Sequence, residues 1–216
     1  MLRRLAATCS VIGLVIACAW PAGAATAMEM VEDALRATEQ VEDYTATLKV
    51  AIEAPNINIP RRTVKVFFKR PDRVHLESNG LAVIPRDALL MGNLATHIKN
   101  YATASFVADG EISGRPVKCI KLSPREQRDG KGRVLVWIDK EHSLLLKSEI
   151  WRSGKRQLSV RFHHSQVGEY WMPAYIITDV AEGAMGDNRG GAHIQMQFTD
   201  YRINTGLSDE IFEDND

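Results

Sequence analysis

The chain has 216 residues, of which 45% are apolar, 25% charged and 7% aromatic, and its 27 basic and 27 acidic side chains cancel. These proportions are those of an ordinary globular protein, and they exclude a disordered chain, a collagen-like repeat and a polytopic membrane protein. A net charge of zero also argues against a nucleic-acid-binding protein, which would carry a basic excess. The length suits one domain or two small ones.

The first 24 residues have the pattern of a secretory signal peptide. Arg3-Arg4 is a short basic region, the stretch from Leu5 to Trp20 carries no charge, and Ala22-Gly23-Ala24 has the small-x-small pattern that signal peptidase recognises. The uncharged stretch is shorter than a membrane-spanning helix of about 20 residues. We therefore predict a signal peptide over residues 1–24, with an uncleaved membrane anchor as the alternative.

A second processing site competes with this one. Val15-Ile16-Ala17-Cys18 resembles a lipobox, in which the cysteine is acylated after cleavage. The signal segment would then be residues 1–17 and Cys18 would be lipidated, whereas simple cleavage would follow Ala24 or Ala27. Either route exports the protein, so we expect a periplasmic location and a single mature domain over residues 28–216.

The cysteines predict no intramolecular disulfide. The chain has three, and the predicted processing removes Cys9, removes or lipidates Cys18, and leaves Cys119 alone in the domain. Cys119 lies in a strand-like run where a cysteine is usually a small buried apolar residue. We interpret it as a core residue rather than a nucleophile.

An amphipathic helix is predicted over residues 28–41, where apolar side chains recur at helical spacing and acidic side chains fill the other face. After Asp43 the apolar period changes to two, which indicates strands with one apolar side. Pro55 and Pro60 bracket an interruption. The pattern is typical of an antiparallel meander, with strands at 44–53, 64–69 and 74–77.

Strand alternation places one set of apolar side chains on a common inner face. Such a face either forms an ordinary core or binds an apolar ligand where the sheet is concave. A slip of one residue would move the whole set to the other face. The candidate cavity residues are Leu48, Val50, Ile52, Val64, Val66, Phe68, Val74 and Leu76.

The segment 80–103 departs from the alternation, because its apolar residues are clustered. Pro85 stands near the first position of a short predicted helix. We interpret this helix as a cover over an opening, with Leu89, Leu90 and Met91 as candidate lid residues.

Strand patterns resume after this segment and are separated by turn residues. The later strands are predicted at 106–111, 117–122, 134–138, 144–151, 158–163, 175–180 and 194–198. One helix followed by about nine to eleven strands predicts a mainly β domain of the antiparallel sandwich or barrel class.

The sequence has no pattern typical of catalysis or metal binding. Its six histidines lack the spacing of a zinc-binding helix, and neither a G-x-S-x-G elbow nor a glycine-rich phosphate loop occurs. We predict no catalytic residue, no metal site and no cofactor. A hydrolase whose site is assembled from distant residues is kept as an alternative.

Several short motifs follow one another along residues 28–213. They are Val41 to Ala46, Phe67 to Arg73, Ile112 to Pro116, Lys121 to Pro124, Trp137 to Lys140, Leu145 to Glu149, Trp171 to Pro173, Phe198 to Asn204 and Leu207 to Phe212. Their order and spacing resemble the bacterial periplasmic lipoprotein-carrier (LolA-like) superfamily, of the outer-membrane lipoprotein-sorting type.

This resemblance implies a half-open antiparallel β-barrel, with helices that close its mouth and a cavity that holds acyl chains. In the carrier branch, an arginine in a Lys-Arg-Pro strand end holds the lid, and the matching residue here is Arg70, between Lys69 and Pro71. An arginine suits this role because its guanidinium offers several donors to the carbonyls of a lid.

Two functions follow from the resemblance. The first is non-enzymatic carriage of lipids or lipoprotein acyl chains between envelope membranes, by a monomer that meets an inner-membrane exporter and an outer-membrane acceptor. The second is an envelope sensor or adaptor that binds a membrane protein or lipid exporter through its rim. A large apolar inner face with an opening favours the carrier, whereas a filled core with an exposed apolar rim favours the adaptor.

Overall fold

The computed structural model describes residues 26–55, 57–77, 101–124, 132–184 and 190–213. One α-helix, ten strands and a short 3₁₀ helix occur in this part of the chain. The strands are β1 Asp43–Ala54, β2 Ile57–Lys69, β3 Arg73–Glu77, β4 Tyr101–Ile112, β5 Arg115–Pro124, β6 Arg133–Asp139, β7 Leu145–Arg152, β8 Lys155–Val167, β9 Tyr170–Val180 and β10 Ala192–Ile203.

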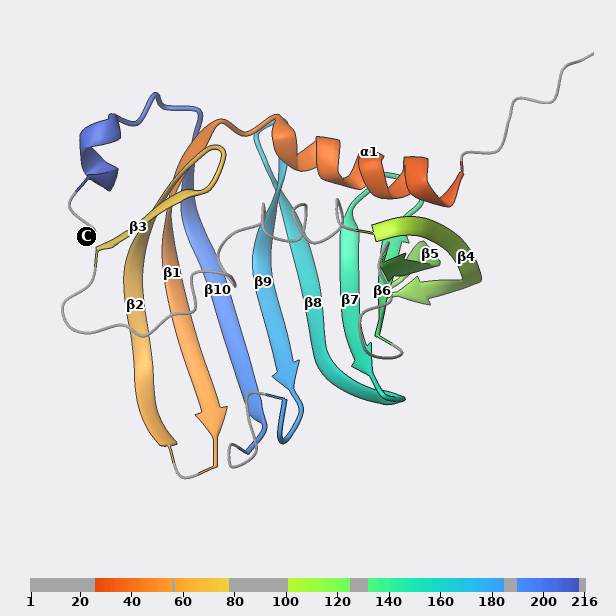
Figure 1. The fold of residues 1–216 in the computed structure, drawn as a ribbon. Coiled ribbons are helices and arrows are strands. Elements are labelled where there is room, and N and C mark those ends of the chain that lie inside the picture. Colours follow the sequence, from red (N-terminus) through yellow and green to blue (C-terminus); the bar gives the residue numbers. More distant parts are fainter. Residues whose placement is uncertain (1–25, 56, 78–100, 125–131, 185–189, 214–216) are drawn as a thin grey trace, which may run out of the picture.

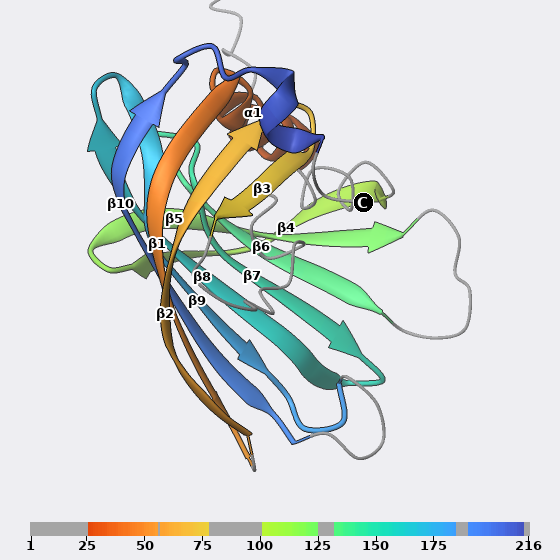
Figure 2. The same ribbon diagram turned by 90° about the vertical axis from the view of Figure 1, so that its left-hand side faces the viewer.

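All ten strands form one antiparallel sheet in the order β3-β2-β1-β10-β9-β8-β7-β6-β5-β4. The edge strands β3 and β4 do not pair with each other, so the sheet curves without closing (Figures 1 and 2). The predicted half-open antiparallel barrel is therefore confirmed. No helix among the described residues has the length and hydropathy needed to cross a membrane.

The helix α1, Ala27–Glu39, begins in a capping box. The Thr26 hydroxyl accepts a hydrogen bond from the Glu29 backbone N–H, and the Glu29 carboxylate accepts one from the Thr26 N–H at 2.7 Å. The prediction extended this helix to residue 41. It ends earlier because Val41 is buried in the core of the sheet.

The strand β2 continues through the interruption that the sequence predicted at Pro60. Pro60 lies in a register shift of the β1–β2 ladder, between Ile59 and Arg62. On the other side, β3 pairs with β2 only from Lys65 onward. In the described part of the chain no strand pairs with this stretch of β2 on that side, and the missing N–H of a proline is tolerated at such an edge.

One face of the sheet can be followed from strand to strand by its register. Directly opposed residues of antiparallel strands share a face. A single row across seven strands contains Ile52, Ile194, Thr178, Val160, Ser148, Val136 and Ile120. We call the side of the sheet that carries this row the inner face and the opposite side the outer face.

The inner face carries two hydrophobic clusters. Under α1, the buried Val31 packs with residues of β5 and β6 such as Ile120 and Val136. The larger cluster covers β1, β2, β9 and β10. The helix therefore lies on the inner side and crosses the upper end of the sheet (Figure 1). On the outer face of the same strands Lys49 and Lys65 are exposed.

The chain after β10, residues 204–213, which we call the C-terminal strap, is bound to the start of β1. The Asp43 carboxylate accepts hydrogen bonds from the backbone N–H groups of Thr205, Gly206 and Leu207. The Asn204 side chain accepts one from the Glu42 N–H at 2.8 Å. The strap ends in the 3₁₀ helix η1, Asp209–Phe212, beside β3 (Figure 2).

Candidate lipid-binding face

The eight predicted cavity residues lie on the inner face. Five of them, on β1 and β2, belong to the larger buried cluster, and the other three pack against it at its border. The buried five are Leu48, Val50, Val64, Val66 and Phe68; the border three are Ile52, Val74 and Leu76. The phase assumed for these strands therefore matches the structure.

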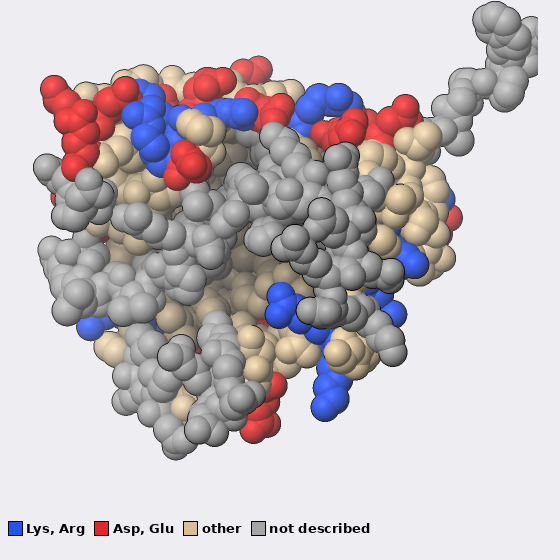
Figure 3. Space-filling view, in the orientation of Figure 1, with Lys and Arg blue, Asp and Glu red and all other residues tan. Residues whose placement is uncertain are grey.

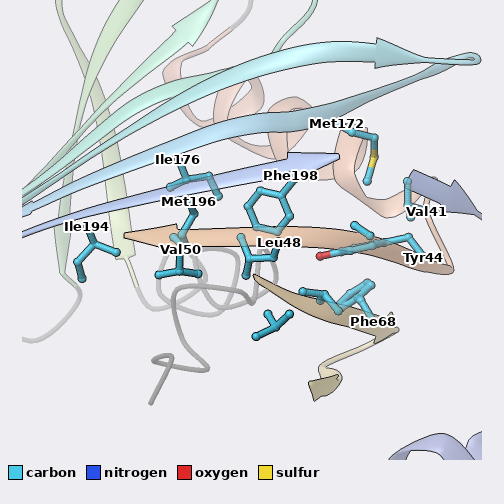
Figure 4. Packing of buried hydrophobic residues seen from close by; sticks show 13 residues of the cluster. Val41, Tyr44, Leu48, Val50, Phe68, Met172, Ile176, Ile194, Met196 and Phe198 are labelled. Carbon is cyan, nitrogen blue, oxygen red and sulfur yellow. The ribbon is translucent and has the colours of Figure 1, made fainter. Parts of the chain in front are cut away.

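The structure adds a second half to this set from β9 and β10. Leu48 lies opposite Phe198 and Val50 lies opposite Met196, because β1 pairs with β10 as well as with β2. Ile176 of β9 continues the same surface (Figure 4). We call the buried cluster and the residues packed against it the apolar floor.

The sequence indicates that the residues of β10 are apolar on one side, but it does not show which strand they lie beside. The alternation in residues 194–198 predicts one apolar side of a strand. Nothing local in the sequence, however, shows that the last strand inserts beside the first.

Aromatic rings close the upper end of the apolar floor. The Tyr44 ring stacks on Phe68, with centroids 5.1 Å apart, and meets the edge of Tyr201 at 5.5 Å. Burial raises the pKa of the Tyr44 phenol, so its hydroxyl stays neutral. Tyr201 donates a hydrogen bond to the Pro173 carbonyl at 2.7 Å. The end of the face is thus a rigid apolar wall.

Above this wall the surface is charged. Asp209 in η1 forms ion pairs with Lys69 and Arg73, which stand at the end of β2 and the start of β3. Acidic and basic side chains lie together along this upper rim, over η1 and α1 (Figure 3). An apolar interior thus lies beneath a polar rim.

Arg70, the predicted lid-holding residue, stands at this rim. Its guanidinium nitrogen Nη2 lies 3.8 Å from the Glu39 carboxylate at the end of α1, and its backbone N–H donates to the Glu42 carbonyl at 2.9 Å. The structure thus joins Arg70 to the helix at the top of the sheet. The other predicted lid residues, Leu89, Leu90 and Met91, lie outside the described residues, as do Cys18 and the signal segment 1–24.

Reactive groups are sparse in the described part of the chain. No group of three or more His, Cys, Asp or Glu side chains is placed there to hold a metal ion. Cys119 is buried and free, and burial raises the pKa of its thiol, which opposes a nucleophilic role. His164 is partly buried, and its buried Nδ1 has no hydrogen-bond partner among these residues.

The fold matches that of three solved structures, one of which is a LolA superfamily protein. A LolA superfamily protein from Nitrosomonas europaea is 13% identical, with a TM-score of 0.57. A putative outer membrane lipoprotein-sorting protein domain from Vibrio parahaemolyticus is 18% identical, with a TM-score of 0.60. A protein of a domain-of-unknown-function family from Desulfovibrio piger is 12% identical, with a TM-score of 0.62. Each alignment covers 88% of this chain and 98% of the other.

A family model described as an uncharacterized protein matches residues 90–216, more than half of the chain. The chain belongs to this family. No curated protein sequence matches it significantly. The comparisons therefore define the fold, and the function has to be argued from the inner face.

Proposed function

We propose that this protein is a non-enzymatic binder and carrier of lipids or lipoprotein acyl chains. The observation that carries the proposal is the apolar floor, which is continuous over β1, β2, β9 and β10 on the inner side of a sheet that does not close. An open curved sheet can admit an acyl chain between its two unpaired edges. The similar domain from Vibrio parahaemolyticus is named for outer membrane lipoprotein sorting, which agrees with this use of the fold.

The free energy available for such binding is large. Burial of one methylene contributes about 0.8 kcal/mol, so a 16-carbon acyl chain gains on the order of 10 kcal/mol before the costs of binding. Capture is therefore easy, and a carrier needs a way to release its cargo. We propose that Arg70 serves this step, because its contact with Glu39 is long and partly exposed and can be exchanged at little cost.

The proposal extends to the location and partners of the protein. A signal peptide over residues 1–24, or a lipidated Cys18, would deliver it to the periplasm. There a monomer would take an acylated ligand from an inner-membrane exporter and pass it to an outer-membrane acceptor. The upper rim supports the carrier, since the charged Lys69, Arg73 and Asp209 stand there. The exposed apolar side chains of Phe106 and Val107, on the edge strand β4, are the surface that an adaptor would use instead.

A titration with the fluorescent fatty acid cis-parinaric acid tests the proposal. Because Leu48 and Val66 are fully buried, a charge at either position would disturb folding, so the variants are placed at the border of the floor. Ile52→Gln and Leu76→Gln should each weaken binding about tenfold through lost apolar contact. Lys49→Gln, on the outer face of β1, is the control and should bind like the wild type. A wild-type protein that does not bind the probe would overturn the proposal.

A further inference from the structure

The hairpin that joins β7 to β8 ends in two exposed cations. Arg152 and Lys155 lie directly opposite each other, on either side of a tight turn through Ser153 and Gly154. Neither forms an ion pair with another residue that the structure describes. Like charges that face each other across two strands destabilise the pairing. The fold therefore gains nothing from this pair of charges, which remain available to a partner.

Further cations stand beside this tip on the outer face. Arg133 of β6 lies opposite Trp151 and covers its ring at 4.7 Å, and Arg156 of β8 lies opposite Trp151 on the other side. Glu149, the only acidic residue of the stretch 145–161, accepts a hydrogen bond from the Trp151 indole at 2.9 Å. It also pairs with Lys147 at 2.8 Å and with Arg156 at 3.4 Å. One carboxylate thus stands among five cations, and we call the following residues the basic hairpin: Arg133, Lys147, Trp151, Arg152, Lys155 and Arg156.

The opposite end of the molecule is acidic. The helix α1 has four acidic side chains and one basic side chain, and η1 adds Asp209 and Glu210. α1 crosses the upper end of the sheet, whereas the tip of the hairpin between β7 and β8 lies at the lower end (Figures 1 and 2). The chain as a whole has no net charge, so the basic hairpin is a local concentration of positive charge. A negatively charged surface would therefore attract the molecule with this hairpin foremost.

We propose that the basic hairpin docks the protein on a membrane surface that contains anionic phospholipids. Arginine and lysine are attracted to the phosphates of such a surface, and tryptophan is enriched at the level of the headgroups. β6 begins opposite Trp151 and β9 ends opposite Leu158, so Arg152 and Lys155 extend beyond the neighbouring strands. A protruding tip of this kind suits a broad surface better than a single extended polymer. The inference does not depend on the apolar floor, and it adds to the proposed function a place where the protein meets a membrane.

Sedimentation with lipid vesicles tests the inference. One set of vesicles is phosphatidylcholine alone, and the other is an equal mixture of phosphatidylcholine and the anionic phosphatidylglycerol. The wild type should bind only the mixed vesicles, and added sodium chloride should weaken this binding because salt screens the charges. The double variant Arg152→Gln/Lys155→Gln should bind the mixed vesicles more weakly, by about fivefold for each charge removed.

Three further variants are controls. Lys49→Gln/Lys65→Gln removes the same net charge from exposed positions on the outer face of β1 and β2, and it should bind the mixed vesicles like the wild type. Arg152→Lys/Lys155→Arg keeps both charges and should keep the binding. Leu76→Gln, at the border of the apolar floor, should also bind the vesicles. Urea denaturation should show that Arg152→Gln/Lys155→Gln is at least as stable as the wild type, since the opposed like charges are gone.

The outcomes separate this inference from the proposed function. A wild type that does not bind the mixed vesicles, or that binds phosphatidylcholine equally well, would overturn the inference. So would equal losses in the two glutamine double variants, or binding to a soluble acidic polysaccharide, such as polygalacturonate, without binding to vesicles. A wild type that docks on the mixed vesicles through the hairpin but does not bind cis-parinaric acid would overturn the proposed function alone.

Discussion

The guanidinium of Arg115 lies 2.7 Å from the carboxylate of Asp139, a side chain that is only 1% exposed. Burial by itself raises the pKa of Asp139, but hydrogen bonds from the Glu141 and His142 backbone and from Arg115 outweigh it and lower the pKa. This pair ties the start of β5 to the end of β6. Arg115 also covers the ring of Trp171 at 4.9 Å.

Replacement of Arg115 should therefore destabilise the fold. Arg115→Met leaves a buried carboxylate with its two backbone donors only, and we expect a loss of about 1–3 kcal/mol in the free energy of unfolding, measured in urea. Lys118→Met removes an ion pair on the same strand whose partner Asp109 is exposed, and it should change stability little. Equal effects of the two substitutions would contradict this account of the buried pair.

His164 should make stability depend on pH. Burial, with smaller contributions from Arg115 and His163, lowers its pKa to about 4 from an ordinary value of 6.5. Between these values the unfolded chain binds more protons than the folded one. The free energy of unfolding should therefore fall as the pH drops from 6.5 to 4, by about 3 kcal/mol at most.

Two glutamine variants isolate this effect. His164→Gln should remove most of the fall between pH 6.5 and 4, whatever it does to stability at neutral pH, because the titrating group is gone. His163→Gln, the exposed neighbour, should keep the fall. Urea denaturation series at several pH values measure both slopes. A His164→Gln protein that keeps the wild-type slope would assign the pH dependence to other groups.

The C-terminal strap should depend on Asp43. Its carboxylate accepts three backbone hydrogen bonds and one from the Thr205 hydroxyl at 3.2 Å. Asp43→Ala should cost about 2–4 kcal/mol and release the strap first, which is visible as faster hydrogen exchange at Gly206 and Leu207. Glu42→Ala, at the exposed position next to it, should leave that exchange unchanged.

The packing of α1 on the inner face should contribute to the stability of the fold. Val31 is 1% exposed and belongs to the cluster with residues of β5 and β6. Val31→Ala should lower the free energy of unfolding by about 1–2.5 kcal/mol, because it deletes two buried methyl groups and leaves a cavity. Glu32→Ala, on the exposed side of the helix, should change it by less than about 0.5 kcal/mol. Denaturation curves in urea compare the two.

The strands could be predicted from the sequence because their alternation is local. The positions of Leu48, Val50 and Val66 follow from a period of two and from one correct choice of phase. The prediction that the chain is interrupted at Pro60 was wrong, because β2 runs through this residue. A proline breaks a strand only where its N–H is needed for pairing. Whether that edge is paired depends on β3, which the local pattern does not reveal.

The other half of the site could not be predicted. Met196 and Phe198 join the apolar floor only because β10 inserts beside β1, and this pairing joins residues about 150 apart in sequence.

The central claim is that the inner face holds an acylated ligand. Native mass spectrometry of the protein purified from its own envelope, followed by solvent extraction, tests it most directly. The account predicts a bound acylated species that is lost on extraction. Protein that is empty when isolated, and that also fails to take up cis-parinaric acid, would contradict it.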